Sequence, residues 1–282
     1  TKNETRQLAV LANDLSNPYF AEIITGFENA AIDNNYLVSI CTAQREIENY
    51  IRRLIAQRID GVFIVGMPPL SDEKYHEIIF NMVEAGIRVL INGIILKDSK
   101  EISHIFVDHM TGIDKAVSYL KSMGHTHIAM VSTFGRNSNF DIRDRMFFSA
   151  MDKYLPDSPK IFVSETGIRN PDMDSSYSLT KRLLTDHPEV TAVICLNDLM
   201  AYGVIQAAAY FNKSVPDELS VIGMDDIYIS RNFNPTVTSI GFDKREYGMM
   251  AFELLYNHIK KNIVKDIDIR TELYIRSSTG LA

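Results

Sequence analysis

The chain lacks several features that mark common classes of protein. It has two cysteines in 282 residues, and no run of basic residues is longer than two. No apolar run approaches the roughly 20 residues that a membrane-spanning helix needs. Asp plus Glu outnumber Lys plus Arg by 36 to 29. A membrane helix and a surface that grips phosphate backbones are therefore not predicted from these residues.

The two cysteines, Cys41 and Cys195, each lie within an apolar run. This placement favours buried, reduced thiols in a cytoplasmic protein over a disulfide framework, although one buried bridge is also compatible with the sequence. No signal-peptide pattern occurs at the start. The chain opens at "TKNETRQLAV" without methionine, so the absence of a leader or of an extra N-terminal domain carries no information.

Short motifs of common catalytic sites are also absent. There is no phosphate-binding loop, dinucleotide fingerprint, nucleophile elbow or CxxC pair. The histidines offer only "HTH" at 125–127, and two local ligands do not complete a zinc site. His125 is expected in the turn after Gly124, and His127 at the start of a strand. No cofactor, no metal and no enzymatic activity are predicted.

The chain does show a regular alternation of apolar strands and amphipathic helices. The segment "RQLAVLAN" is typical of a buried strand, and "NPYFAEIITGFENAAIDN" of a helix. Asn17 can cap that helix, and Pro18 suits its first turn. One face of the helix is apolar, through Phe20, Ile23, Ile24, Phe27, Ala30 and Ala31.

The same alternation continues along the chain. Further strands are predicted at "YLVSIC", "GVFIVG", "IRVLIN", "HIFVD", "HIAMVS", "IFVS", "TAVICL", "LSVIGM", "VTSIGF" and "TELYIR". A late helix has Tyr247, Met250, Ala251, Leu254 and Leu255 on one side. About ten parallel-type strands exceed one comfortable open sheet. The prediction is an α/β fold of two doubly wound parallel-sheet lobes.

Ligands of such sheets bind outside the carboxyl ends of the strands, so the residues there are the candidates for ligand binding or catalysis. These positions hold Asn13, Asp14, Asn92, Asp108, Asn197, Asp198, Asp225 and Asp226. Asn and Asp are also common there as helix caps and turn residues. Asp198 is predicted to be such a cap. An enzyme would use Asp14 and Asp225 as acid and base or gather carboxylates around Mg²⁺, and little supports that alternative.

Three other side chains could contact a ligand. The guanidinium of Arg143, just after a strand and a loop, would offer a fork of donors to sugar hydroxyls, carboxylate or phosphate. A salt bridge to Asp141 or Asp144 is the structural alternative. Tyr19 and Phe20 are adjacent, so one of them must lie off the buried helix face. An aromatic side chain at the mouth of a cleft can pack on the apolar face of a ring.

Eight segments, in order, resemble the effector-binding core of the lactose-repressor/galactose-repressor (LacI/GalR) family of bacterial transcription regulators. They are "NPYFAEIITGFENAA", "RIDGVFIVG", "VDHMTGIDKAVSYLKSMGHTHIAMVS", "RDRMFFSAM", "LNDLMAYGVIQAA", "VPDELSVIGMDD", "NPTVTSI" and "YIRSST". Together they span essentially the whole chain.

The resemblance implies two periplasmic-binding-protein-like lobes joined by three crossover strands, with a small effector between them. It places an N-terminal lobe at 5–104 plus 240–265 and a C-terminal lobe at 105–237 plus 267–280. It also implies a homodimer and a helix-turn-helix headpiece that binds operator DNA. The 282 residues resemble such a regulator without its headpiece. A phosphorylated carrier protein as corepressor is a further partner known within the family.

Carried over by motif, the family's ligand-binding positions fall on eight residues. They are Asp14, Tyr19, Phe20, Asn92, Arg143, Asn197, Asp225 and Phe242. The resemblance assigns opposed, charge-assisted hydrogen bonds to Arg143 and Asp225. Adjacent residues that leave a strand point in different directions, so Asp226 is assigned to the turn and the two aspartates are not a catalytic pair.

Several positions depart from the family pattern. Met146 replaces a small residue, Asp108-His109 the usual Asp-Asn, and Ser175-Ser176 the usual Ser-Gly, while "GIRNPDMDSS" leaves one pocket wall undefined. Carbohydrate is the commonest effector class of the family, and acidic and amide residues beside an aromatic ring suit polyhydroxyl ligands. A purine and a phosphorylated sugar are alternative effectors.

The chain is predicted to be the effector-sensing core of a cytoplasmic transcriptional regulator. The regulator is expected to be a repressor that binds a small effector, such as a sugar. The alternative is an extracytoplasmic sugar-binding protein of a transport system, which would share the fold and the ligand class. "VPDELSVIGMDD" followed by "NPTVTSI" favours the regulator. A carboxylate-dependent sugar hydrolase is the third and weakest hypothesis.

Overall fold

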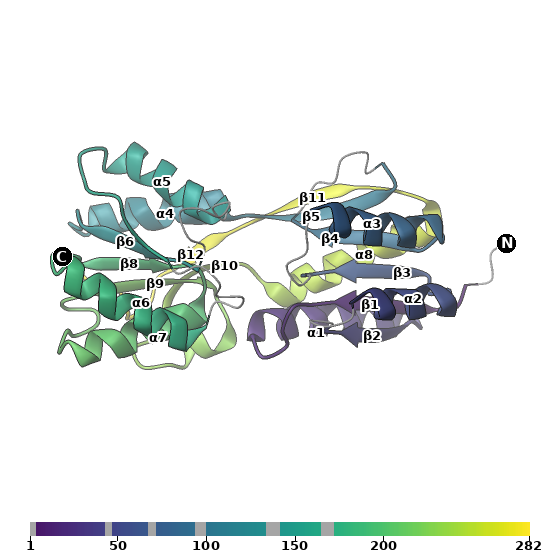
Figure 1. Cartoon of the computed structure of the whole chain (residues 1–282), viewed down its shortest axis with the longest axis horizontal. Helices are drawn as coiled ribbons and strands as arrows, with labels where there is room; N and C mark the ends of the chain where they lie inside the picture. The colour runs from purple at the N-terminus through teal and green to yellow at the C-terminus, as the bar shows by residue number, and fades with distance from the viewer. Residues whose placement is uncertain (1–3, 43–46, 67–71, 94–99, 134–141, 165–171) are drawn as a thin grey trace. The chain divides into compact units, whose positions relative to one another are not determined.

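The structure is a computed structural model that describes residues 4–42, 47–66, 72–93, 100–133, 142–164 and 172–282 (Figure 1). The chain divides into two compact units. Unit 1 comprises Thr1–Val107 and Asp243–Ile269, and unit 2 comprises Asp108–Phe242 and Arg270–Ala282. The chain passes between the units three times. Residues 240–242, expected in the N-terminal lobe, belong to unit 2, whereas residues 105–107 and 267–269, expected in the C-terminal lobe, belong to unit 1.

Unit 1 contains a six-stranded sheet in the order β11-β5-β4-β3-β1-β2. Strands β1 to β5 form parallel pairs. The elements are β1 (Gln7–Leu11), α1 (Pro18–Asp33), β2 (Leu37–Cys41), α2 (Ile47–Gln57), β3 (Gly61–Ile64), α3 (Asp72–Glu84), β4 (Arg88–Asn92), β5 (Ile102–Asp108), α8 (Lys244–Lys261) and β11 (Asp266–Arg270).

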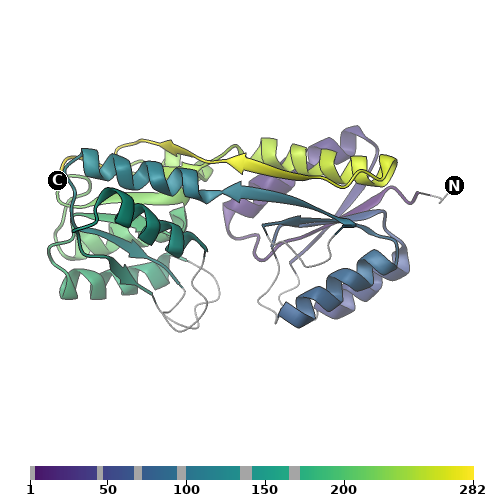
Figure 2. The ribbon, with the colours of Figure 1, turned by 90° about the horizontal axis from the view of Figure 1, so that it is seen from above.

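Helices cover both faces of this sheet, because alternate strand residues point to opposite sides. One core cluster joins Leu11, Ile64 and Ile91 from the strands to residues of α2 and α3. On the other face α1 packs against α8. Figure 2 shows α8 on one side of the sheet and α3 on the other. The central strands β1, β3 and β4 are therefore buried along most of their length and almost continuously apolar, as the sequence predicted.

Unit 2 contains a second six-stranded sheet, in the order β12-β10-β9-β8-β6-β7. Its pairs are parallel except for β10 with β12, which is antiparallel. The elements are α4 (His109–Ser122), β6 (Ile128–Val131), α5 (Ile142–Tyr154), β7 (Ile161–Val163), α6 (Met173–Asp186), β8 (Ala192–Cys195), α7 (Asp198–Tyr210), β9 (Ser220–Asp225), the short 3₁₀ helix η1 (Tyr228–Arg231), β10 (Thr238–Gly241) and β12 (Glu272–Tyr274).

The two parallel-sheet α/β units confirm the predicted fold class. Asn17 caps α1 by accepting a hydrogen bond from the Tyr19 backbone N–H, and Pro18 is the first residue of that helix. Both cysteines are buried and free, as expected. The sequence did not reveal β11, whose residues "DIDIR" alternate between charged and apolar side chains at the edge of the sheet.

Candidate functional site

The structure places the first four predicted ligand residues at the carboxyl ends of strands in unit 1. Asp14 follows β1, Tyr19 and Phe20 open α1, and Asn92 ends β4. The Phe20 ring lies beside Gly66, which follows β3, since a Cβ on that glycine would come within 3.3 Å of the ring. β1, β3 and β4 are parallel, so these side chains share one edge of the sheet.

Local contacts fix each of these residues. The Asp14 carboxylate accepts hydrogen bonds from the backbone N–H and the hydroxyl of Ser16, at 2.8 and 2.7 Å. The rings of Tyr19 and Phe20 meet edge to face, with centroids 5.2 Å apart. This edge of unit 1 therefore presents two aromatic rings beside an acidic turn.

The amide of Asn92 is oriented by Tyr247 of α8, a residue that the sequence places only on one side of a helix. Asn92 Nδ2 donates to the carbonyl of Val65 at 3.0 Å, and its Oδ1 accepts from the Tyr247 hydroxyl at 2.9 Å. Burial raises the pKa of Tyr247 well above its usual value, so the hydroxyl keeps its proton and donates. A buried tyrosine needs a polar partner, but the sequence gives no sign of which one.

The other four predicted ligand residues lie at the corresponding edge of unit 2. Asn197 follows β8, Asp225 ends β9, Phe242 follows β10, and Arg143 is in the first turn of α5. The Arg143 guanidinium donates to the carbonyl of Leu196 at 3.2 Å, which brings it next to Asn197. Asp141, one proposed salt-bridge partner of Arg143, lies outside the described residues.

The predicted role of Asp198 as a helix cap is wrong. Asn197 is the N-cap of α7, because its side chain accepts from the Met200 N–H at 2.8 Å. Asp198 is the first helical residue and is fully buried. Its carboxylate bonds residues outside the helix, so it is not the cap that its position before "LMAYGVIQAAA" indicated.

Asp225 and Asp226 occupy an unusual stretch of backbone. Their φ angles are 104° and 49°, a region that costs a non-glycine residue of order 1–3 kcal/mol. The buried Asp226 carboxylate lies between Arg231 and Arg276, at 2.7 and 2.5 Å. Asp226 is therefore held in an internal ion cluster, in keeping with its predicted place in the turn. Asp225 is 8% exposed.

A hydrogen-bond network surrounds the Asp198 carboxylate. It accepts from the Ile227 N–H at 2.9 Å, the Ser230 hydroxyl at 2.6 Å and the Ser239 hydroxyl at 2.6 Å. Burial raises the pKa of this carboxyl to about 7, against the lowering effect of those three bonds. The Tyr202 hydroxyl extends the network to Ser230 at 2.9 Å.

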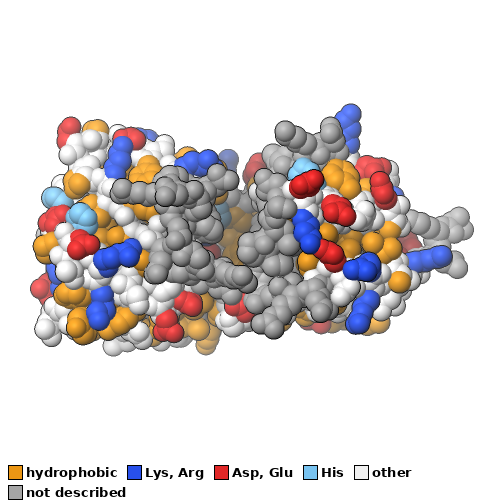
Figure 3. All heavy atoms as spheres, viewed as in Figure 1, with side chains coloured by type: hydrophobic (Ala, Val, Ile, Leu, Met, Phe, Trp, Pro, Cys, Tyr) orange, Lys and Arg blue, Asp and Glu red, His pale blue; other side chains and the backbone are white. Residues whose placement is uncertain are grey.

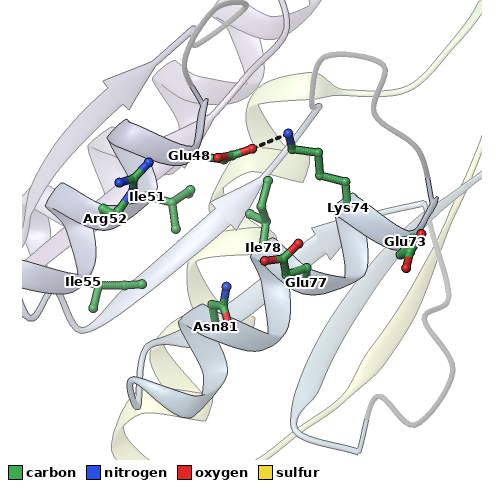
Figure 4. Close-up of a pocket in the computed structure, with 9 residues that line it drawn as sticks. All are labelled: Glu48, Ile51, Arg52, Ile55, Glu73, Lys74, Glu77, Ile78 and Asn81. Atoms are coloured by element: carbon green, nitrogen blue, oxygen red, sulfur yellow. Dashed lines mark ion pairs between the residues drawn. The ribbon is translucent and has the colours of Figure 1, made fainter.

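A pocket of about 510 Å³ lies elsewhere in unit 1, between α2 and α3 (Figure 4). Its walls carry charges of both signs, with Glu48 and Lys74 paired across it, and its apolar lining includes Ile51 and Ile78. None of the eight predicted ligand residues lines it. Among the described residues no group of three His, Cys, Asp or Glu is arranged to hold a metal, and no helix is long and apolar enough to cross a membrane.

Two parallel-sheet α/β units, each with polar residues at the carboxyl ends of its strands, define a periplasmic-binding-protein-like protein. A family model described as a periplasmic binding protein-like domain matches residues 117–279. The chain is 29% identical over 286 residues to the HTH-type transcriptional repressor PurR of Pasteurella multocida, covering 98% of this chain and 82% of that protein.

Two further comparisons agree. The PurR repressor of Photorhabdus laumondii subsp. laumondii is 30% identical over 291 residues, which cover 98% of this chain and 80% of that one. A solved LacI family transcriptional regulator from Enterococcus faecium has a TM-score of 0.83 at 24% identity, covering 97% of this chain and 98% of the other. The chain belongs to the LacI/GalR family and is its effector-binding core. The relatives are transcriptional regulators, which does not favour the transport alternative.

Proposed function

We propose that this chain senses a sugar or sugar derivative and couples its binding to DNA binding by a helix-turn-helix headpiece. The observation that carries the proposal is the placement of the eight ligand residues. Four lie at the carboxyl edge of the sheet in unit 1 and four at that of unit 2. Parallel sheets bind ligands at this edge.

The chemistry of these residues suits a polyhydroxyl ligand. Carboxylates accept from hydroxyl groups, the Asn92 and Asn197 amides both donate and accept, and Arg143 donates. The aromatic rings of Tyr19 and Phe20 can pack on the apolar face of a sugar ring. The solved regulator from Enterococcus faecium contains bound ribose, which supports the same ligand class here.

The remaining parts of the proposal concern partners and location. The PurR relatives are HTH-type repressors, so operator DNA is the proposed macromolecular partner, bound by a headpiece outside these 282 residues. Figure 3 shows charges of both signs interspersed over the described surface of one face. This face therefore lacks the concentrated positive charge that attracts DNA. The proposal also includes a homodimer, a cytoplasmic location and no catalytic activity. A phosphorylated carrier protein is proposed as a corepressor.

Thermal denaturation across a panel of sugars and nucleosides tests the ligand class. A ligand present at 100 times its Kd stabilises a protein by about 2.7 kcal/mol, which raises the Tm of a protein of this size by about 5 °C or more. A shift with one or a few sugars is expected. No shift with any compound would contradict the sugar proposal, and a shift with nucleosides alone would replace it with a nucleoside effector.

Substitution of the two adjacent aspartates tests how the site is built. Asp225→Ala should abolish the ligand-induced Tm shift and leave the fold intact, whereas Asp226→Ala should lower the Tm of the unliganded protein. Equal loss of binding in the two variants, without a difference in stability, would contradict the assignment. Product formed from the bound sugar, and lost in Asp225→Asn, would instead support a hydrolase.

A further inference from the structure

We propose that Asp198 is a positioning residue for the effector: its buried carboxylate holds the backbone turn that presents Asp225 to the ligand. The inference rests on the proposed function, because Asp225 is the acidic ligand residue of that proposal. Asp198 itself is fully buried and directly follows Asn197, another predicted ligand residue. It would act through its neighbours and not by contact with the effector.

The carboxylate bonds three residues in two segments that are distant from it in sequence, the start of η1 and β10. One oxygen accepts from the Ile227 backbone N–H and the Ser230 hydroxyl, and the other accepts from the Ser239 hydroxyl of β10. The Ser239 hydroxyl oxygen in turn accepts from the Asp226 N–H at 2.9 Å. Asp198 therefore fixes both backbone amides that follow Asp225, one directly and one through Ser239.

The backbone of this turn needs such support. Asp225 and Asp226 both have positive φ, and conformations of this kind persist only where the surroundings over-determine them. The outer side of the turn is held by the ion pairs of Asp226 with Arg231 and Arg276. The inner side is held by Asp198.

Two glycines make room for this arrangement. A Cβ on Gly223 of β9 would lie 2.1 Å from an oxygen of the Asp198 carboxylate. A Cβ on Gly241 of β10 would lie 2.4 Å from the Cβ of Asp226. Both strands therefore carry the smallest residue where the carboxylate and the turn pack against them, so the turn has little space in which to relax.

The ionisation of Asp198 gives the inference a distinctive signature. The ionisable groups that interact with it are Cys195 of β8, Tyr202 of α7 and Asp226, while Arg231 and Arg276 neutralise Asp226. Burial sets the pKa of Asp198 at about 7. The ionised form accepts charge-assisted bonds, which are roughly twice as strong as neutral ones. Effector affinity should therefore fall as the pH drops through about 7.

The test compares Asp198→Asn with the matched control Asp217→Asn. Asn keeps the size of Asp198 but cannot ionise, and Asp217 is an exposed carboxylate shortly before β9. Binding of the sugar found in the panel is measured by calorimetry between about pH 6 and about pH 8, on either side of the Asp198 pKa. Backbone amide NMR of residues 225–227 is recorded over the same range without ligand.

Asp198→Asn is expected to fold and to bind the sugar at least about tenfold more weakly than wild type at about pH 8, the effect of losing a hydrogen bond to a charged group. Its sugar affinity should not change as the pH passes through about 7. Its amide signals at 226 and 227 should lose the titration seen in wild type. Asp217→Asn should behave as wild type in both measurements.

Two outcomes would overturn the inference. One is unchanged sugar affinity in Asp198→Asn together with wild-type amide signals, which leaves the proposed function intact. The other is a wild type whose 226 and 227 amides do not titrate near pH 7, a result that is independent of any ligand. If Asp198→Asn does not fold, Ser239→Ala removes the hydroxyl that links Asp198 to the Asp226 N–H, while the bonds of Asp198 with Ile227 and Ser230 stay in place. It should shift the Asp226 signal and weaken binding, and wild-type behaviour in both measurements would count against the proposal.

Discussion

The two units place their predicted ligand residues at the same edge of similar sheets, but they support them by different means. In unit 1 the support is neutral: Asn92 is held between the Val65 carbonyl and the Tyr247 hydroxyl. In unit 2 it comes from ionisable groups, because the buried carboxylates of Asp198 and Asp226 hold the turn that follows Asp225. Buried charges cost much more to disturb than neutral hydrogen bonds, so unit 2 should tolerate changes at its edge less well.

The largest expected effect comes from the ion cluster of unit 2. Asp226→Ala removes the buried carboxylate between Arg231 and Arg276, and it places alanine at a positive φ. Removal of one partner of a fully buried ion pair costs about 3–5 kcal/mol. Arg231 is 56% and Arg276 15% exposed, so a loss near the lower end, about 3 kcal/mol, is expected in the free energy of unfolding in urea. Asp226→Asn keeps the shape and should cost less. A loss below about 1 kcal/mol in the Ala variant would show that the cluster behaves as a surface pair.

A steric change in unit 1 should come next. Gly248 of α8 faces α1, and a Cβ there would lie 2.1 Å from the Ile23 carbonyl oxygen. Gly248→Ala should therefore lower the free energy of unfolding by about 1–3 kcal/mol, although Ala is normally the better helix former. Met249→Ala, at the exposed neighbouring position, is the control and should change stability by about 0.5 kcal/mol or less. Increased stability in Gly248→Ala would mean that the two helices separate easily.

The units should respond to pH in opposite directions. The pKa of Asp198 is about 7 in the folded protein, against an ordinary value of 3.8. The folded state therefore binds the proton of this carboxyl more tightly than the unfolded state does. The stability that this proton contributes is lost as the pH rises from about 4 to 7. Burial lowers the pKa of His258 in unit 1 from its ordinary value of 6.5 to about 4. Its contribution is lost as pH falls from 6.5 towards 4.

Chemical denaturation at several pH values separates these two contributions. Relative to Asp198→Asn, wild type should lose on the order of 1 kcal/mol per pH unit between about pH 5 and 7. Relative to His258→Gln, wild type should gain stability with rising pH over a similar range. Parallel curves for wild type and Asp198→Asn would contradict the raised pKa of this carboxyl.

The smallest expected effect is on the neutral support of unit 1. Tyr247→Phe removes only the hydroxyl that bonds Asn92, which should cost about 1 kcal/mol in unfolding. Asn92 would still donate to Val65. Tyr256→Phe, a change of the same kind on the same helix, serves as the control. If Tyr247→Phe costs as much as Asp226→Ala, the distinction between the two units does not hold.

Much of the fold was predictable because it depends on short-range patterns. The cap at Asn17, the start at Pro18 and the apolar strands follow from local sequence. β11 was missed because its exposed edge position gives it alternating charge and not an apolar run. The predicted edge residues do follow the strands expected, yet their binding of a ligand stays a prediction.

The supporting residues could not be predicted for a different reason. Asp198 bonds Ile227, Ser230 and Ser239, which are 29 to 41 positions away. Tyr247 reaches Asn92 across 155 positions. Local sequence presents Asp198 as a cap and Tyr247 as part of an apolar face. Only the three-dimensional fold shows the polar partner of each.

The three passages of the chain between the units have a consequence for synthesis. Unit 1 is completed by residues 243–269, and α8 is the partner that covers α1. A ribosome therefore finishes almost the whole of unit 2 before it supplies that cover. The apolar face of α1, with Phe27 fully buried in the finished protein, must wait for a helix more than 200 residues downstream. Folding of the N-terminal half is thus tied to completion of the chain.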